Sequence, residues 1–200
     1  MAGTIARWRD IWARFSGRGT YPHELAALLL IPLRGIVLSP SQLVAHLQLT
    51  ASSRVLEIGP GPGFFSVAVA RAAPRGRLEL VDIQLEMLRR ARRRLREAGV
   101  RHAASTQASA AALPFCDAAF DVAFLAAVLG EVPDPAACVA SIARVLRQGG
   151  RLVLAELPGD PDVLTSEQLR HLAAGTGLTF VSSRRVSRAT ITTFERTSGR

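Results

Sequence analysis

Short apolar runs alternate with longer amphipathic stretches along most of the chain. The apolar runs, rich in Val, Leu and Ile, lie at residues 54–59, 77–83, 120–129 and 150–157. Apolar residues at helical spacing separate them and cover residues 64–73, 85–99 and 135–150. We expect the last helix to end on Gly149 and Gly150, because glycine tolerates the left-handed turn that closes many helices. Apolar strands joined by helices predict a parallel sheet with helices on both faces.

The two ends of the chain follow other patterns. Residues 178–188 and 189–197 are β-rich runs in close succession, which predicts an antiparallel pair at one edge of the sheet. Before residue 40 the pattern is helical but irregular. No linker rich in Pro or Ser divides the 200 residues, 48% of which are hydrophobic. We therefore expect one domain, residues 41–200, preceded by an N-terminal helical cap, residues 1–40.

The net charge of +9 raises the question of an anionic partner such as nucleic acid or a membrane surface. All 25 basic residues are Arg, and they are densest in residues 89–96. Four residues in and before this run recur at helical spacing: Leu85, Leu88, Arg92 and Leu95. Most of the arginines then fall on the outer face of one helix. A solvated helix face is the favoured interpretation, and a nucleic-acid footprint is the alternative.

Cysteine usage and hydropathy indicate the cellular setting. Cys116 and Cys138 lack the spacing of metal ligands and a secretory context, so we expect reduced thiols and no metal site. The most apolar segment, residues 25–38, is interrupted by a proline, an arginine and a glycine. It falls short of the roughly 20 apolar residues of a membrane span. These features predict a soluble, cytoplasmic protein.

The stretch VLEIGPGPGFFSVAVA, residues 55–70, carries the strongest chemical signal. Gly59, Gly61 and Gly63 lie between an expected strand and an expected helix. Ligands of open parallel sheets bind beyond the carboxyl ends of the strands, and glycines let a ligand approach the backbone closely. Asp82 ends the next strand, nineteen residues after Gly63. A glycine turn followed by a strand-end carboxylate that can accept hydrogen bonds from ribose hydroxyls indicates an adenosine cofactor. Both features also have a structural interpretation. The glycines could only form a sharp corner between strand and helix, and Asp82 could be a helix N-cap.

The spacing within the turn bears on which cofactor is bound. A dinucleotide site has the pattern G-x-G-x-x-G, in which the pyrophosphate rests on a helix N-terminus. This chain instead has G-x-G-x-G, with Glu57 two residues before the first glycine. A carboxylate there repels a pyrophosphate and suits a cation. The pattern therefore favours a ligand with an amino acid and a sulfonium over NAD.

Four ordered motifs together resemble a known family. They read EIGPGPG at 57–63, VDIQLEML at 81–88, LPFCDAAFDVAF at 113–124 and ARVLRQGGRLVLAE at 143–156. They are similar to the class I S-adenosylmethionine-dependent methyltransferases, in particular the small bacterial type that includes the quinone-biosynthesis, methyltransferase domain 11-like branch. The resemblance implies an α/β, Rossmann-like, doubly wound and mostly parallel seven-stranded sheet with an antiparallel C-terminal edge hairpin. It also implies S-adenosylmethionine as the cofactor.

The resemblance assigns cofactor roles to matching positions. Glu57 and the turn would hold the methionine end, Asp82 the ribose, Ile83 and Met87 the adenine and ribose, and the backbone near the end of strand 120–129 the amino-acid moiety. The turn residues are Gly59, Pro60, Gly61 and Gly63, and the backbone segment is Phe124, Leu125 and Ala126. The family usually has an Asp before the LPF segment to accept from the adenine amine, where this chain has Ser109 followed by Ala110. A hydroxyl can accept that bond without charge assistance.

The sequence constrains the methyl acceptor mainly by excluding classes of substrate. No NPPY-like stretch follows strand 120–129, which argues against amino-group methylation of bases or glutamine, and no cysteine cluster indicates arsenic chemistry. What remains is a small, apolar organic acceptor methylated at carbon, oxygen or nitrogen. The alternatives are a cofactor-binding protein without catalysis and a nucleic-acid methyltransferase. The catalytic residues are unassigned. His23 and Glu131 are candidates, and each also has a structural interpretation.

An apolar stripe marks the start of the chain. On a helical wheel, Ile5, Trp8, Ile11, Trp12 and Phe15 fall on one side. The stripe packs on the domain, covers the cofactor cleft as a lid, or makes a weak peripheral membrane contact through residues 5–15. The sequence leaves these three interpretations open, and it does not predict the oligomeric state.

Overall fold

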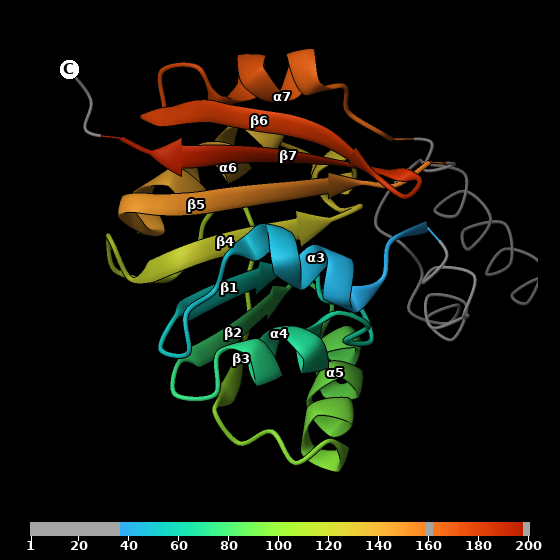
Figure 1. The fold of residues 1–200 in the computed structure, drawn as a ribbon. Coiled ribbons are helices and arrows are strands. Elements are labelled where there is room, and N and C mark those ends of the chain that lie inside the picture. The colour runs from blue at the N-terminus through green and yellow to red at the C-terminus, as the bar shows by residue number, and fades with distance from the viewer. Residues whose placement is uncertain (1–36, 159–161, 198–200) are drawn as a thin grey trace, which may run out of the picture.

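A seven-stranded sheet forms the centre of the described structure, a computed structural model that describes residues 37–158 and 162–197 (Figure 1). The strand order is β3-β2-β1-β4-β5-β7-β6. The first five strands in this order are parallel, and β7 is antiparallel to both β5 and β6. The strands are β1 Arg54–Ile58, β2 Arg77–Asp82, β3 Ala103–Gln107, β4 Phe120–Ala126, β5 Leu146–Glu156, β6 Leu178–Val186 and β7 Ala189–Arg196. The predicted doubly wound sheet with an antiparallel pair at its edge is confirmed.

Helices cover both faces of this sheet. They are α3 Pro40–Leu47, α4 Ser66–Ala72, α5 Leu85–Glu97, α6 Pro135–Val145 and α7 Ser166–Ala173, with a 3₁₀ turn, η2, at Leu129–Glu131. One buried cluster joins α3, α4 and α5 to alternate strand residues such as Val55 and Phe124. A second joins α6 and α7 to the intervening residues, such as Leu56 and Leu125. The period-two alternation of strand side chains explains why neighbouring residues enter different layers.

Strand β3 has no counterpart among the predicted strands. Its sequence, AASTQ, contains no apolar run, and its side chains are half-buried or exposed. β3 pairs with β2 alone and lies at one edge of the sheet. An edge strand of small and polar residues does not need the apolar pattern by which the central strands were recognised.

The helix predicted over residues 135–150 is wrong at its C-terminal end. α6 ends at Val145, and β5 begins at the next residue. Residues 147–150 form a bulge, because Leu146 pairs with Phe120 while Arg151 pairs with Val122. A Cβ on Gly150 would lie only 2.7 Å from the carbonyl oxygen of Arg147, so the bulge needs a glycine there. The two glycines thus serve a strand irregularity rather than a helix end.

The helix α5 carries its arginines outward, as predicted. Its buried residues are Met87, Leu88, Ala91 and Leu95. Leu85 and Arg92, which were expected on the inner side, are exposed, so that part of the prediction is wrong. The stripe that is buried faces β2 and β3, against which α5 packs.

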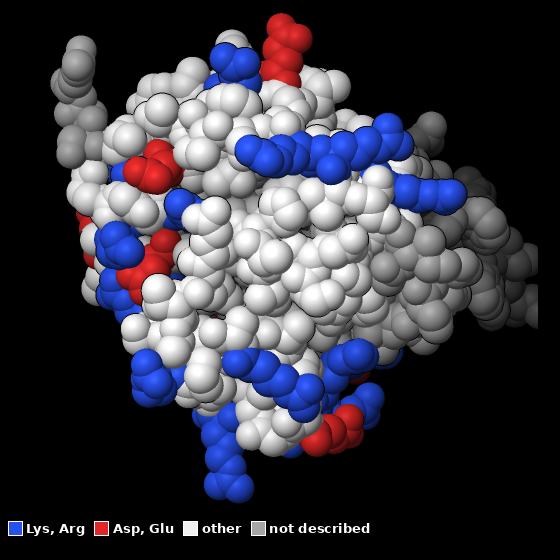
Figure 2. Space-filling model, viewed as in Figure 1, with Lys and Arg blue, Asp and Glu red and all other residues white. Residues whose placement is uncertain are grey.

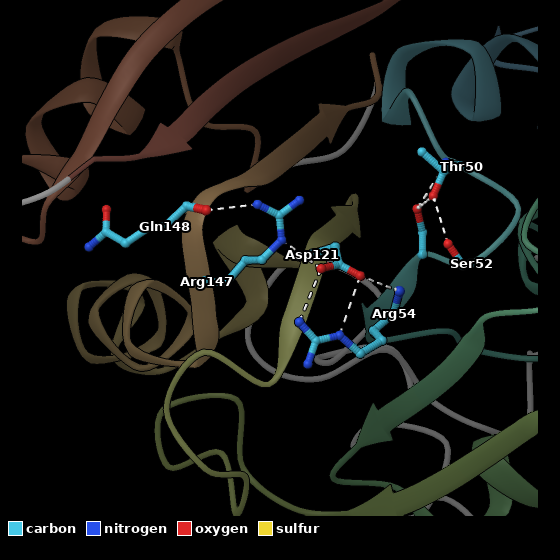
Figure 3. A network of polar contacts seen from close by, with 7 residues as sticks. Thr50, Ser52, Arg54, Asp121, Arg147 and Gln148 are labelled. Carbon is cyan, nitrogen blue, oxygen red and sulfur yellow. Dashed lines mark hydrogen bonds and ion pairs between the residues drawn. The ribbon is translucent and has the colours of Figure 1, made fainter.

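A charged network ties the amino ends of the central strands together (Figure 3). Asp121, in β4, accepts the backbone N–H of Arg54 at 2.7 Å and the Arg147 Nε at 2.7 Å. The Arg54 guanidinium adds an ion pair at 3.1 Å. Although partial burial acts in the opposite direction, the two arginines lower the pKa of Asp121 to about 2. β1, β4 and β5 are therefore held in place at the end of the sheet opposite to the glycine turn.

Three compositional expectations can be compared with the described residues. Cys116 is exposed and Cys138 is buried, and the two form no disulfide. Residues 37–158 and 162–197 contain no cluster of three or more His, Cys, Asp or Glu able to hold a metal, and none of their helices is long and apolar enough to cross a bilayer. The stripe at residues 5–15 and most of the expected cap lie outside the described residues. The boundary expected at residue 40 and the cap stay predictions.

Candidate functional site

The carboxyl ends of β1, β2 and β4 bring the predicted glycine turn, Asp82 and the end of β4 to one place. In the sheet, Ile58 pairs with Val81 on one side and with Leu125 on the other. The Gly59 N–H donates to the carbonyl of Val81 at 2.8 Å. The three segments therefore leave the sheet side by side at its ligand-binding edge.

The glycine turn needs its glycines for both conformation and space. Gly59, Gly61 and Gly63 have φ angles of 66°, 53° and 81°. A Cβ on Gly59 would lie 2.5 Å from Val128 Cγ2, and one on Gly63 would lie 3.1 Å from the Cα of Ala91. The turn is thus packed between the loop after β4 and helix α5. The turn is therefore a sharp, tightly packed corner. Its glycines also leave the backbone exposed for a ligand, so both interpretations of the turn apply.

Glu57 is a buried carboxyl group directly beneath the turn. Its side chain is 2% exposed, and its Oε2 has no hydrogen-bond partner among the described residues. Burial raises the pKa of Glu57 to about 8, and the nearby Ser66 hydroxyl opposes this shift without forming a well-directed hydrogen bond. A buried acceptor without a donor is costly in a folded protein, and it marks a position where a ligand can supply that donor.

Asp82 is the second carboxyl group at this edge. Its Oδ1 accepts the N–H of Gln84 at 2.9 Å. Burial raises the pKa of Asp82 to about 6, while backbone N–H groups of Gln84, Gly61 and Ile83 oppose the rise. Gln84 is itself the N-cap residue of α5, so the Asp82 carboxylate closes the turn before the helix rather than occupying the cap position. The contact with Gly61 joins Asp82 to the glycine turn, the two parts of the predicted cofactor site.

The apolar side chains beside Asp82 are arranged differently from the prediction. Ile83 is 58% exposed and Leu85 is 43% exposed, whereas Met87 is buried. The Gln107 side-chain amide donates to the Ile83 carbonyl at 3.0 Å and fixes this loop against β3. Ile83 and Leu85 are therefore available to a ligand, whereas Met87 belongs to the buried side of α5. Sequence reasoning missed Leu85 because its helical spacing placed it in the core.

Ser109 and Ala110 follow β3 at the same edge. Ser109 is exposed, and its hydroxyl accepts the N–H of Ala111 at 3.3 Å. Its carbonyl accepts the N–H of Ala112, so the segment forms a tight turn. The Ser109 hydroxyl thus has a local structural partner, and adenine recognition by it stays a prediction.

The end of β4 offers backbone rather than side chains. Phe124 and Leu125 are buried on opposite faces of the sheet, and Ala126 is half-buried. Ala127 follows with a φ of 54°, in the left-handed region that non-glycine residues rarely adopt. Its N–H donates to Ala155 at 2.8 Å, so the chain turns sharply over the end of β5. Strained backbone of this kind concentrates at functional sites.

The candidate acceptor side lies beyond β4 and β5. Glu131 ends the η2 turn and is half-buried. Gly130 packs so closely on the backbone of Asp162 that a Cβ would not fit. Glu156, at the end of β5, is 5% exposed and accepts the Leu164 N–H at 3.3 Å. Sequence reasoning missed Glu156, although a carboxylate closing an apolar strand was a usable signal. His23 lies outside the described residues.

Comparison with known proteins identifies the family. A family described as "Methyltransferase domain" matches residues 56–154. The ubiquinone/menaquinone biosynthesis C-methyltransferase UbiE of Pasteurella multocida is 39% identical over 105 residues, which are 52% of this chain and 39% of that protein. The UbiE of a Marinomonas species is 37% identical over 119 residues, 58% of this chain and 47% of that protein. The chain belongs to the class I S-adenosylmethionine-dependent methyltransferases.

Solved structures agree on the methyltransferase fold. A SAM-dependent methyltransferase from Aquifex aeolicus superposes with a TM-score of 0.80 at 17% identity, covering 88% of this chain and 98% of that one. The [4+2]-cyclase SpnF superposes with a TM-score of 0.71 at 20% identity, covering 80% of each chain. At such identities these similarities establish the fold alone, and the cyclase illustrates that this fold carries more than one chemistry.

The sequence matches stop well short of whole relatives. The chain matches less than half the length of each of the two UbiE proteins. The family match, residues 56–154, spans the sheet from β1 to β5 and contains the glycine turn and Asp82. Membership in the family makes S-adenosylmethionine the cofactor, and it leaves the acceptor to be determined.

Proposed function

We propose that this methyltransferase transfers a methyl group from S-adenosylmethionine to a small, apolar organic acceptor. The observation that carries the proposal is Glu57, a buried carboxyl group with an unpartnered oxygen under the glycine turn and beside the Asp82 loop. A cationic, hydrogen-bond-donating ligand satisfies this oxygen, and a pyrophosphate does not. The residues present therefore fit a ligand with an ammonium and a sulfonium.

The proposed cofactor contacts follow from the position of each residue along the carboxyl edge of the sheet. Glu57, Gly59, Pro60, Gly61 and Gly63 would hold the methionine end, with the glycines allowing a close approach to the backbone. Asp82 would accept hydrogen bonds from the ribose hydroxyls, which its place at the end of β2 supports. Each charge-assisted hydrogen bond of this kind contributes about 1.5–3 kcal/mol.

The adenine and amino-acid ends would use the neighbouring loops. Ile83 and Leu85, both exposed, offer apolar contacts to the adenine, and Met87, predicted to share this role, is buried. Ser109 and Ala110 border the same place, and the Ser109 hydroxyl is the proposed acceptor for the adenine amine. The backbone of Phe124, Leu125 and Ala126 would cradle the amino-acid moiety.

The protein's part in the reaction would be mainly positional. The bound cofactor supplies a sulfonium methyl group that is already electrophilic. The chain has to hold the acceptor atom in line with that methyl group and keep water out, which exploits proximity and orientation. A base is required only where the acceptor must lose a proton, and Glu131 and His23 remain the candidates for it.

An apolar acceptor is supported by the composition of the loop after β4. Ala126, Ala127, Val128 and Leu129 follow one another without a charged residue. The relatives from Pasteurella and Marinomonas are named as C-methyltransferases of ubiquinone and menaquinone biosynthesis. A carbon of a quinone-type ring is therefore the first acceptor to test, and oxygen and nitrogen acceptors are the next.

The deciding experiment measures formation of S-adenosylhomocysteine with a panel of acceptors. The panel contains reduced short-chain quinones, phenols, amines and RNA, with Asp82→Asn as the control that weakens cofactor binding. Turnover with one class of small molecule supports the proposal. Calorimetric binding of the cofactor without turnover supports the alternative of a non-catalytic binding protein. Turnover on RNA alone supports the nucleic-acid alternative. The cytoplasmic location stays a prediction.

A further inference from the structure

Three arginines at one end of β6 lie level with the candidate site. They are Arg184, Arg185 and Arg188, here named the β6 arginine cluster, and all three are exposed. Across the sheet Ala126 pairs with Ala155, Ala155 with Ile191, and Ile191 with Arg184. With strands about 4.8 Å apart, Arg184 lies roughly 15 Å from the end of β4. The turn between β6 and β7 thus reaches the same edge as the ends of β4 and β5 (Figure 1).

No acidic side chain of the described residues neutralises the cluster. Among residues 37–158 and 162–197, the ion pairs involve arginines elsewhere, such as Arg54, Arg90 and Arg144, and none involves the β6 arginine cluster. Figure 2 shows a band of arginine side chains along the β6 side of one face, bordering a broad area without charged side chains. Uncompensated arginines concentrated at the candidate site's edge favour an anionic partner there.

The geometry of the cluster indicates an extended partner rather than a single small anion. Arg184 pairs with Ile191 and Arg185 with Thr190, so the two side chains leave opposite faces of the sheet. Arg188 lies in the turn, where its N–H donates to the carbonyl of Val37. Side chains that diverge in this way cannot enclose one phosphate or carboxylate, but they can contact a broad anionic surface together.

Protection of the sheet edge explains only part of this pattern. Charged residues on edge strands prevent pairing with other chains, and β6 is an edge strand. Such protection is needed along the whole strand, yet residues 178–182 carry no charge and include Val181, which is 51% exposed. The arginines gather at the candidate site's end, and the exposed Val181 lies three residues before Arg184 in the same strand.

These features favour a bilayer over a nucleic acid. Binding of single-stranded nucleic acid relies on aromatic faces that are open to stacking. Phe180 is 36% exposed, but the guanidinium of Arg170 already lies over its ring, 4.7 Å from the centroid. Exposed arginines on the same strand as an exposed valine suit the headgroup region of an anionic bilayer. We propose that the β6 arginine cluster docks the protein on an anionic lipid surface, with the candidate site's edge facing the membrane. The reason for such docking, access to an apolar acceptor dissolved in the bilayer, rests on the proposed function.

The test compares two triple variants of the full chain with equal loss of charge. One combines Arg184→Gln, Arg185→Gln and Arg188→Gln. The control combines Arg92→Gln, Arg93→Gln and Arg96→Gln, exposed residues in the second half of α5, on the far side of the sheet from β6. Co-sedimentation uses vesicles of phosphatidylcholine with and without an equal part of phosphatidylglycerol, and calorimetry with S-adenosylmethionine checks that each variant retains its cofactor site.

We expect the intact chain to bind only the vesicles with phosphatidylglycerol, more weakly as salt rises. The β6 variant should lose about 100-fold in vesicle affinity, and the α5 control less than tenfold. Equal losses in the two variants would show an effect of net charge and overturn the proposal, as would no vesicle binding by the intact chain. Binding of RNA that the β6 variant loses while its vesicle binding persists would assign the surface to nucleic acid. Cofactor binding is measured separately, so failure of docking is distinguishable from failure of the proposed function.

Discussion

Asp82 is the residue whose removal tests the cofactor site most directly. Its carboxylate lies at the end of β2 and already accepts a backbone N–H from Gln84. We predict that Asp82→Ala weakens binding of S-adenosylmethionine by about 1.5–3 kcal/mol, because charge-assisted hydrogen bonds to the ribose are lost. Isothermal titration calorimetry measures the change, and Asp82→Asn should fall in between. Equal affinities for the wild type and the alanine variant would show that the ribose lies elsewhere.

Glu57 should couple stability to pH in a definite direction. Its pKa is about 8 in the folded chain and close to the ordinary 4.5 when unfolded, so the folded state holds its proton longer. The contribution of the protonated Glu57 to the free energy of unfolding is complete below pH 4.5. It is lost as the pH rises through about 8. We predict that Glu57→Gln stabilises the cofactor-free protein at pH 8 by a few kcal/mol, and hardly at all at pH 4.5. Urea unfolding at both pH values measures the difference, which would be independent of pH if Glu57 were solvated.

At the scale of elements, the contact between the glycine turn and the loop after β4 leaves the least room for a larger side chain. Gly59→Ala forces a left-handed alanine, which costs roughly 1–2 kcal/mol, and also places its Cβ against Val128. We predict that Val128→Ala in the Gly59→Ala background recovers part of the lost unfolding free energy, about 1 kcal/mol or more. Thermal or chemical unfolding of the two single variants and the double variant measures this coupling. Strictly additive effects would mean that the loop moves aside.

The elements also show what the sequence could and could not predict. The central strands, α4 and α5 were predictable because both faces of the sheet are buried and each strand therefore carries an apolar run. β3 was not, because its AASTQ sequence lies at an edge and has no such run. The end of α6 was misplaced because Gly149 and Gly150 carry the same signal in a strand bulge as at a helix end.

The residues of the candidate site likewise divide into those that the sequence could predict and those that it could not. Glu57, the glycines and Asp82 were found from spacing, since a turn and a strand end are local features. The exposure of Leu85, the burial of Met87 and the place of Glu156 depend on how α5 and the loop to Leu164 pack. Such tertiary packing leaves little trace in the order of residues.

At the scale of the whole molecule, the N-terminal segment is separable from the core in principle. The two buried clusters of residues 37–158 and 162–197 join the helices and strands of the sheet domain, which is the part expected to fold by itself. We predict that deletion of residues 1–20 leaves a folded domain that binds S-adenosylmethionine but has lost methyl transfer. Circular dichroism, calorimetry and the turnover assay together test this. An unfolded truncation product would show that the apolar stripe at residues 5–15 belongs to the core.

The position of β7 also has a consequence for synthesis. β7 comes last among the strands and inserts between β5 and β6, so β6 has no other neighbour in the sheet. While the ribosome is still adding residues 189–196, the nascent chain exposes β6 with both of its edges unpaired, a state prone to aggregation. The charged residues that follow the exposed Val181, Arg184 and Arg185, then act as gatekeepers against aggregation of the nascent chain. The last two strand pairings of the sheet thus both await β7, and a stop codon at the start of β7 would remove both of them at once.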